Sequence, residues 1–319
     1  MVFGFFQLGI GNVALIRGIH NIRPEHAGCA LTIGNFDGVH LGHRAVLNQL
    51  SEFATDLKSV LLTFEPHPRE YFATTTAPHR LTPLAEKLRR LQRTGLDHLL
   101  VARFGPALAN LEPREFVLRI LHEKLRVRVL IVGDDFRFGK GGRGDFALLS
   151  DMSQKLGFEL HRQHSHVLDE RRISSTWVRE CLSQGDIGKA NVLLGDPYCV
   201  QGRVAHGRQL GRTIGFPTAN IDLTRHPPPI SGVFAVLVHG ISAAPLPGVA
   251  NLGRRPTVDG EGITLETNLF DFDGDLYGQR IRVELVQRLR EEKKFDSFDA
   301  LVEQIGRDAD ASRECLGAT

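Results

Sequence analysis

Two histidines three residues apart, His40 and His43, offer a pair of ring N–H donors for chemistry on an anion. They close the segment "GNFDGVHLGH" (34–43), which follows a short apolar run typical of a strand and precedes apolar residues at helical spacing. The pair therefore falls at the start of a predicted helix, where free backbone N–H groups and the helix dipole favour negative charge. Two ring donors there could stabilise charge on a phosphoryl oxygen while one phosphate attacks another.

Two alternative roles stay open for this pair. Histidines at this place can simply cap a helix, and taken alone the short H-x-G-H pattern fits that role equally well. Zinc is disfavoured because no cysteine or carboxylate cluster lies at metal-ligand spacing. Gly42 would let a nucleotide approach the backbone closely. The turn ahead of the histidines consists of Gly34, Asn35, Phe36, Asp37 and Gly38.

A second candidate for phosphate binding is the segment "ISSTWVREC" (173–181). It places hydroxyl groups where another helix is predicted to start and a guanidinium in the early turns of that helix. Hydroxyls, free backbone N–H groups and an arginine together suit a polyphosphate, although a plain helix cap with a surface arginine is a common alternative. The residues concerned are Ser174, Ser175, Thr176 and Arg179.

The segment "GDDFRFGKGGRGD" (133–145) contains a literal G-x-G-x-x-G pattern. We do not interpret it as a dinucleotide fingerprint, because it lies several residues beyond the preceding predicted strand. Phe136 and Phe138 could stack on a flat ring or pack in a core. His67 lies between two prolines at the end of another predicted strand, in a position to face a ligand.

The second half of the chain carries a glycine-rich segment, "HGRQLGRTIGFPTANI" (206–221), that is not a Walker A motif. Its glycines could admit phosphates, and Thr218 and Asn220 offer oxygen ligands to a hard cation such as Mg²⁺. Taken alone, the segment is better interpreted as a turn-rich loop. Glu266 occupies the polar face of the period-two pattern "ITLETNL", where it could accept a hydroxyl proton or simply be solvated.

The patterns of predicted elements divide the chain near residue 187. Strand-like runs alternate with helical patterns from 29 to about 186, which predicts a doubly wound α/β parallel sheet with ligands beyond the carboxyl ends of its strands. Short strands separated by Gly and Pro then predict an antiparallel barrel or sandwich, closed by a final helix. We predict an extension at 1–13 and domains at 14–186 and 187–319. The strand candidates of the first domain are 29–34, 60–64, 98–104, 127–133 and 158–163.

The composition fits a reduced, globular protein. The chain has 319 residues with 42% hydrophobic residues, and its 39 basic and 37 acidic residues nearly balance, which argues against a general nucleic-acid or membrane-surface binder. The four cysteines are scattered, no apolar run reaches the length of a membrane span, and the apolar start lacks the basic region of a signal peptide. These features predict a cytoplasmic location.

The ordered set of motifs resembles the bacterial bifunctional riboflavin kinase/FAD synthetase family. The first half contributes "LTIGNFDGVHLGHRAVL", "TFEPHP", "GDDFRFG", "GRGD" and "ISSTWVRECL". The second half contributes "GRTIGFPTAN", "GVFAV", "GVANLGRRPTV", "LETNLFDF", "DLYG" and "LREEKKF". Each motif alone is weak, but the order is specific, and the resemblance runs from residue 15 to the end.

For the first half, the resemblance implies an adenylyltransferase related to the H-x-G-H nucleotidyltransferases. It would join FMN to the AMP part of ATP and release pyrophosphate, with His40 and His43 stabilising the transferring phosphate. The hydroxyls and the arginine of 173–181 would hold the ATP phosphates. Other contacts to nucleotide and flavin are expected from Gly34, Asn35, Phe36, Asp37, Gly38, Gly42, His67, Asp135 and Phe136.

For the second half, the resemblance implies a riboflavin kinase in which the riboflavin 5′-hydroxyl attacks the γ-phosphate of ATP. Thr218 and Asn220 match the family's Mg²⁺-binding Thr-Ala-Asn, and Glu266 matches its catalytic base. Further contacts are expected from Gly207, Gly211, Arg212, Gly215, Pro217 and Arg290. The chain departs from the family pattern at Arg208 and Gln209 and in "PPPISGVFAV", which puts loop details in doubt.

The predicted function is therefore two-step synthesis of FMN and then FAD, with riboflavin, FMN, FAD and ATP as its small-molecule partners and Mg²⁺ accompanying ATP. No nucleic-acid or membrane partner is expected, and protein partners are left open. One alternative is an α/β half that serves another adenylyl acceptor, such as nicotinamide mononucleotide or phosphopantetheine. A non-catalytic flavin carrier is another, but it predicts loss of the candidate catalytic residues, all of which are present.

Overall fold

The computed structural model describes residues 12–73, 76–133, 135–163, 166–205, 218–257 and 260–318. The chain forms two compact units, which are described separately. The first extends to Pro78 and resumes from Thr82 to Ser174, and the second contains His79–Leu81 and the chain from Ser175 onward. Helices α7 (Ser175–Gln184) and α8 (Ile187–Leu194) pack together in the second unit, so this division precedes residue 187. The domain boundary at residue 187 stays a prediction.

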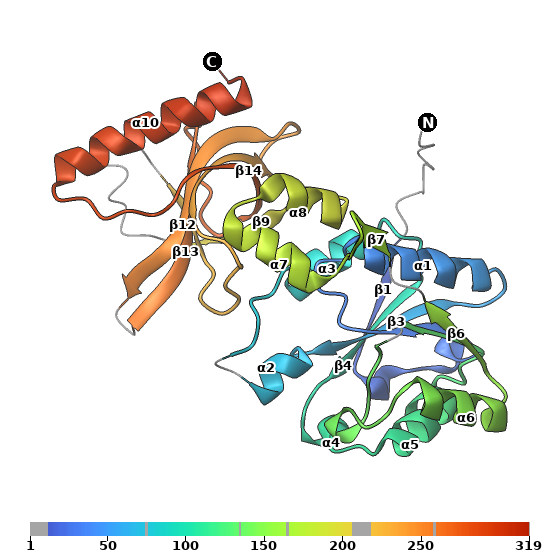
Figure 1. The fold of residues 1–319 in the computed structure, drawn as a ribbon. Coiled ribbons are helices and arrows are strands. Elements are labelled where there is room, and N and C mark those ends of the chain that lie inside the picture. Colours follow the sequence, from blue (N-terminus) through green and yellow to red (C-terminus); the bar gives the residue numbers. More distant parts are fainter. Residues whose placement is uncertain are drawn as a thin grey trace. The chain divides into compact units, whose positions relative to one another are not determined.

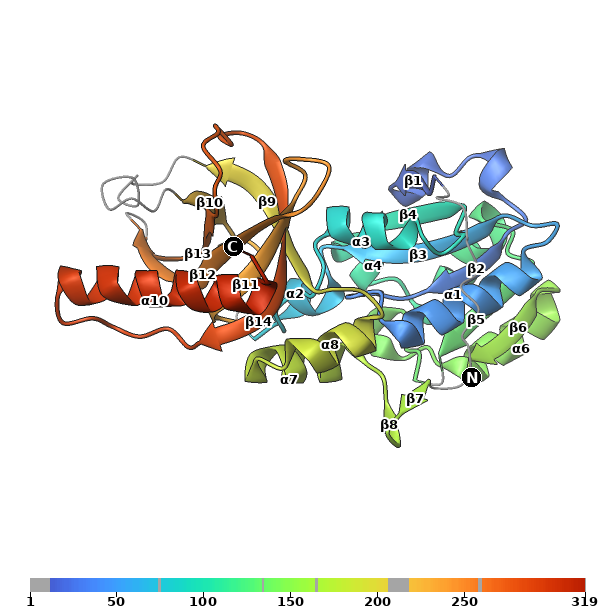
Figure 2. The same cartoon turned by 90° about the horizontal axis from the view of Figure 1, so that it is seen from above.

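The first unit is built on a six-stranded sheet in which every neighbouring pair of strands is parallel (Figures 1 and 2). The spatial order is β1-β4-β3-β2-β5-β6. The five predicted strands and the doubly wound architecture are confirmed. The strands are β1 (Ala14–Arg17), β2 (Ala30–Ile33), β3 (Ser59–Glu65), β4 (His98–Arg103), β5 (Val129–Gly133) and β6 (Glu159–Gln163).

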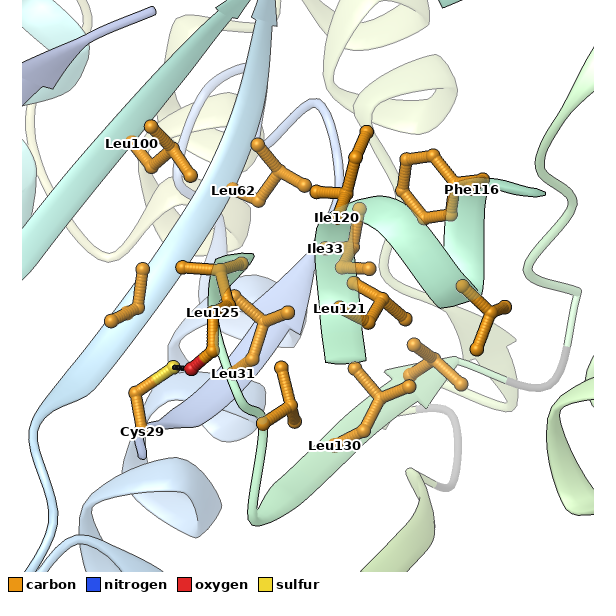
Figure 3. Close-up of a cluster of buried hydrophobic side chains, with 14 of the residues drawn as sticks. Cys29, Leu31, Ile33, Leu62, Leu100, Phe116, Ile120, Leu121, Leu125 and Leu130 are labelled. Carbon is orange, nitrogen blue, oxygen red and sulfur yellow. Dashed lines mark hydrogen bonds between the residues drawn. The ribbon is translucent and has the colours of Figure 1, made fainter. Parts of the chain in front are cut away.

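Both faces of this sheet are buried under helices, as parallel strands require. One face packs against α1 (Leu41–Phe53) and α3 (Leu84–Leu91). The other packs against α5 (Pro113–Phe116), its π-helical continuation η3 (Val117–Lys124) and α6 (Phe146–Leu156). Figure 3 shows the core on this second face, where side chains from the sheet meet Phe116, Ile120 and Leu121.

Shorter elements connect these layers. They are η1 (Ile19–Asn21), η2 (Pro24–His26), α2 (Pro68–Phe72), α4 (Pro106–Ala109), η4 (Lys140–Gly142) and the strand pair β7 (Val167–Leu168) and β8 (Arg171–Arg172). Within the described ranges, no helix is long and apolar enough to cross a membrane.

The second unit contains a closed antiparallel barrel with the order β10-β13-β12-β11-β14-β9. Of the predicted alternatives, barrel or sandwich, the structure has the barrel. Its strands are β9 (Cys199–Ala205), β10 (Ala219–Asp222), β11 (Gly232–His239), β12 (Leu246–Thr257), β13 (Gly260–Leu269) and β14 (Arg280–Arg290).

The predicted closing helix is α10 (Phe298–Leu316), which lies against β11, β12 and β14 (Figure 1). Ser297 caps it through a hydrogen bond from the backbone N–H of Ala300. Val233 and Val249 of the barrel pack with Ala309 of the helix in a small apolar cluster. The helix thus covers one outer face of the barrel.

Candidate active sites

The turn that carries the two histidines emerges at the point where the strand order reverses. From β2 the sheet continues through β3 and β4 on one side and through β5 and β6 on the other. The loops after β2 and β5 therefore leave the sheet side by side and in opposite directions. In open parallel sheets such a switch point, beyond the carboxyl ends of the strands, is the usual place of ligand binding.

His40 and His43 are stacked at the N-terminus of α1. His40 is the N-cap, and its Nδ1 accepts a hydrogen bond of 3.3 Å from the backbone N–H of His43. The ring centroids lie 3.6 Å apart, and Phe36 stacks on the other side of His43 at 4.5 Å. Since Nδ1 of His40 is an acceptor, a neutral His40 ring carries its proton on Nε2. The capping interpretation is thus correct for His40, and it leaves the opposite nitrogen as a donor.

The surroundings of His43 favour a neutral imidazole. Burial, followed by the neighbouring imidazole of His40 and the positive charges of Lys87 and Arg172, holds the pKa of His43 well below its ordinary value. Its Nδ1 is buried and has no hydrogen-bond partner within the described ranges. A buried nitrogen without a partner is rare in folded proteins and calls for an explanation.

The turn ahead of the histidines has a strained backbone that neighbouring residues hold in place. Phe36 and Val39 have φ angles of 48° and 47°, a conformation that a β-branched residue rarely adopts. Thr82 makes three hydrogen bonds to the turn. Its hydroxyl accepts from the N–H of Gly38 at 2.9 Å, and its own N–H and hydroxyl donate to Asp37 at 2.9 and 3.2 Å. Strain of this kind persists where the surroundings over-determine it, which is typical of functional sites.

The loop after β5 is joined to the segment that leads into 173–181. Arg172 donates two hydrogen bonds, of 3.0 and 3.1 Å, to the carboxylate of Asp135, and they lower the pKa of that carboxyl group. A side chain at Gly42 would come within 3.2 Å of the carbonyl oxygen of Ile173. The chain therefore passes directly beside the H-x-G-H turn just before Ser174, and only glycine fits easily at position 42.

Of the other predicted phosphate ligands, Ser174 is the last residue of the first unit and the rest lie at the start of α7 in the second. Ser175 and Thr176 form the first turn of α7, and the Nε of Arg179 donates to the carbonyl oxygen of His79 at 2.7 Å. Their position relative to the histidine pair stays a prediction. In the first unit, His67 caps α2 at the carboxyl end of β3, where its Nδ1 accepts from the N–H of Arg69 at 3.1 Å.

Phe136 is partly buried and packs against the apolar core. Its ring stacks on Phe138 with centroids 5.5 Å apart, and Phe138 in turn contacts Phe116. The core-packing alternative is confirmed for Phe138, while contact between the partly exposed Phe136 and a flavin stays a prediction. The adjoining glycine-rich segment is a tight turn, because a side chain at Gly144 would meet the Phe138 ring at 2.7 Å.

In the barrel, the register of the strands places three polar residues in one row. Asn220 of β10 is paired with Glu266 of β13, and Glu266 is paired with Asn251 of β12. Residues directly opposite in antiparallel strands share a face, with Cβ atoms about 4.5–5.5 Å apart. Glu266 is half-buried, whereas its neighbours Leu265 and Thr267 are fully buried. The predicted alternation at Glu266 is confirmed, and Asn220 lies beside it.

Thr218 and Asn220 have the chemistry of a site for a hard cation. The amide nitrogen of Asn220 donates to the carbonyl oxygen and hydroxyl of Thr218, at 3.1 and 3.3 Å. These bonds use the amide nitrogen and leave Oδ1 as the side-chain atom that can accept a further bond. Asn220 Oδ1 is buried and has no hydrogen-bond partner within the described residues. A buried, unpaired oxygen requires a partner, and oxygen ligands are those that Mg²⁺ prefers.

The remaining predicted contacts of the second half divide into two groups. Arg290 is described, and its guanidinium binds the carboxylate of Asp308 in α10 at 2.7–3.0 Å. This ion pair joins β14 to α10, and a ligand contact by Arg290 stays a prediction. The other group lies outside the described residues and comprises Gly207, Gly211, Arg212, Gly215 and Pro217.

Several residues in and around these sites are not recognisable from sequence patterns. Asn251 lies within the motif "GVANLGRRPTV". A polar residue between two apolar ones there is typical of a strand and does not indicate a ligand-binding site. The carboxylate of Glu292 lies against Gly253 and bonds to the Asn251 side chain, and burial raises the pKa of Glu292. Lys87 and Arg172 look like ordinary surface charges in sequence, and only the folded chain places them near His43.

Family models match both halves of the chain. The model described as FAD synthetase matches residues 22–177, and the model described as riboflavin kinase matches residues 194–316. The two matches follow each other along the chain, as the two structural units do.

Full-length relatives carry the same pair of regions. The bifunctional riboflavin kinase/FMN adenylyltransferase of Escherichia coli K12 is 49% identical over 96% of this chain and 98% of its own length. The protein of the same description from Haemophilus influenzae is 47% identical over 94% of this chain and 98% of its own. A solved structure described as a macrolide-efflux protein from Streptococcus pneumoniae has a TM-score of 0.78 at 30% identity, covering 95% of this chain and 99% of that chain.

Proposed function

The chain belongs to the family of bifunctional riboflavin kinase/FMN adenylyltransferases, and from this membership we infer how its two halves divide the work. The protein phosphorylates riboflavin with ATP to give FMN and ADP. It then joins FMN to the AMP part of ATP, which gives FAD and diphosphate. The observation that carries this conclusion is the match of both family models, in order, on a chain that aligns with its relatives over nearly their full length.

For adenylyl transfer, we propose that the stacked histidines act on the α-phosphate of ATP. A phosphate oxygen of FMN attacks the α-phosphorus, and the bond between that phosphorus and the oxygen bridging to the β-phosphate breaks. No protein nucleophile is required, so positioning and charge stabilisation do the catalysis. Nε2 of His40 and a ring nitrogen of the neutral His43 donate to the oxygens on which charge develops, beside the free N–H groups at the start of α1.

For phosphorylation, we propose that Glu266 accepts the proton of the riboflavin 5′-hydroxyl. The hydroxyl oxygen forms a bond to the γ-phosphorus of ATP while the bond to ADP breaks. Supporting this role, Glu266 is half-buried and lies directly opposite Asn220, so the base and the candidate cation ligands share one face of the barrel. When bound there with ATP, Mg²⁺ would neutralise phosphate charge, and Thr218 and Asn220 are the residues that would hold it.

We expect Asn220→Ala to raise the Mg²⁺ concentration needed for half-maximal FMN formation by roughly tenfold or more. The substitution removes Oδ1, the buried oxygen that has no partner within the described residues. The measurement is a Mg²⁺ titration of the initial rate of riboflavin phosphorylation. The same variant should form FAD from supplied FMN with the wild-type Mg²⁺ dependence. In the control Asn110→Ala, which changes an exposed asparagine, both activities should keep that dependence. An unchanged titration in Asn220→Ala would exclude this amide from the cation site.

The proposed function is tested by incubating the full-length protein with riboflavin, ATP and Mg²⁺ and resolving the flavins by chromatography over time. FMN should accumulate first and FAD should follow. FMN without FAD would mean that the α/β half serves another acceptor. Riboflavin that remains unchanged but bound would indicate a carrier.

We expect the second half to work alone. Residues 187–319 contain the whole barrel and α10, and domains with their own cores often fold independently. This fragment should convert riboflavin to FMN and make no FAD in the chromatographic assay. A longer fragment, 175–319, includes α7, whose last residue Gln184 accepts a 2.6 Å hydrogen bond from Arg288 of the barrel. If only the longer fragment is soluble and active, the domain begins at α7; inactivity of both would contradict independent folding.

We also propose a cytoplasmic location. The side chains of Cys29, Cys181, Cys199 and Cys315 form no disulfides with one another, and the cytoplasm keeps cysteines in this reduced state.

A further inference from the structure

Helix α3 places buried charges under the turn that carries the histidines. Glu86, Lys87 and Arg90 are respectively 0%, 5% and 1% exposed, although charged residues are rarely buried to this degree. Glu86 pairs with Arg90 at 3.0 Å and with Arg89 at 2.6 Å. The helix also contributes Leu91 to the core on this face of the sheet. An apolar helix face would have sufficed to cover the sheet, so covering it does not account for the buried charges.

Lys87 is bonded to the backbone of the turn. Its Nζ donates to the carbonyl oxygen of Asn35 at 2.6 Å, and the hydroxyl of Thr63 donates to the same oxygen at 3.2 Å. Arg90, one helical turn later, approaches the carbonyl oxygen of Gly38 at 3.5 Å. Between these two carbonyl groups lie Phe36, with its positive φ, and Asp37, which Thr82 binds. The lysine therefore holds one end of a strained segment whose other end leads directly to His40.

The ammonium group of Lys87 also acts on the catalytic pair electrostatically. The titratable and charged groups that act on His43 are His40 at the start of its own helix, Lys87 from α3 and Arg172 from β8. Arg172 is paired with the carboxylate of Asp135, and one hydrogen bond of Lys87 is to the carbonyl oxygen of Asn35 in the turn. A positive charge fixed under the turn disfavours protonation of the stacked imidazoles.

We propose that Lys87 is a positioning residue for adenylyl transfer: it fixes the turn that carries His40 and His43 and supplies a buried positive charge beside them. The inference rests on the proposed function of this half. It assigns to α3 a part in the reaction, in addition to its part in the core.

The test compares Lys87→Met, which keeps the bulk of the side chain and removes its charge and donor, with Lys87→Arg, which keeps both. Lys155→Met is the matched control, because Lys155 is an exposed residue of α6 that pairs with Asp151 one helical turn away. All are full-length proteins assayed for FAD formation from FMN and, separately, for FMN formation from riboflavin. The wild-type protein must make FAD in this assay. If it makes none, the result contradicts the proposed function and does not bear on the role of Lys87.

We expect Lys87→Met to lower kcat for FAD formation by about 10²-fold, the loss that follows a small misplacement of catalytic groups. The KM values for FMN and ATP should change much less, and FMN formation should be unaffected. In histidine-labelled protein, NMR titration should show a higher pKa for His43 in Lys87→Met than in wild type, because a nearby positive charge has been removed. Lys87→Arg and Lys155→Met should leave that pKa near its wild-type value.

Because Lys87 acts through the histidine, adding Lys87→Met to His43→Ala should lower the rate far less than it does in wild type. Equal effects in both backgrounds would overturn the proposal, as would near-normal FAD formation by Lys87→Met. Loss of the thermal unfolding transition of the first unit in Lys87→Met would also overturn it, because the lost activity would then follow from a lysine that merely stabilises the fold. An unchanged His43 pKa would overturn the electrostatic part of the role.

Discussion

His43→Ala is expected to lower the rate of FAD formation by about 10²–10³, the usual loss when one donor to a developing charge is removed. The side chain stacks between His40 and Phe36, and its buried Nδ1 has no hydrogen-bond partner within the described parts of the chain. A protein given riboflavin, ATP and Mg²⁺ should therefore accumulate FMN. Chromatography of the flavins measures both products in one reaction.

The control for this substitution is His122→Ala, because His122 is an exposed residue of η3. It should make FAD at the wild-type rate. His40→Ala should resemble His43→Ala, with an added effect on α1 because His40 is its N-cap. If His43→Ala lost FMN and FAD formation equally, the histidines would be holding the fold together and would not be acting on phosphate.

Glu266→Gln is expected to slow FMN formation by roughly 10²–10⁴, the contribution of a general base. A primary hydroxyl is a poor nucleophile at neutral pH, so proton removal during attack lowers the barrier. Glutamine keeps the shape of the side chain and its place in the row between Asn220 and Asn251, but it cannot accept the proton. The initial rate of riboflavin phosphorylation at saturating Mg²⁺ measures the effect.

Two comparisons make this result specific. Supplied FMN should still be converted to FAD by Glu266→Gln at the wild-type rate, because that reaction belongs to the first half. Glu303→Gln, at an exposed position on α10, should leave both activities unchanged. Near-normal phosphorylation by Glu266→Gln would remove this carboxylate from the mechanism and leave positioning and the cation to account for the catalysis.

The elements that sequence patterns miss are the short ones. β1 and β10 have four residues each, too few for a period of two to be recognised, and unlike the equally short β2 they are not fully buried apolar runs. Both are held by partners far away in sequence: β1 pairs with β4, and β10 pairs with β13 and β9. β10 also contains Asn220. The sequence identifies this residue as a possible oxygen ligand but does not predict the strand in which it lies. Long strands, and helices with a clear apolar stripe, are predicted because their own side chains encode them.

By itself, the sequence determined the order and chemical types of the motifs, the change from alternating strands and helices to consecutive strands, and the place of His40 and His43 at a helix start. These are local properties, set by residues near one another in the chain. Tertiary structure alone decided that the histidine turn lies where the strand order reverses, that a partly buried His43 lies near Lys87 and Arg172, and that Asn220 lies opposite Glu266. Burial, strand register and the charge around a buried group arise from contacts between segments distant in sequence, and no local pattern specifies them.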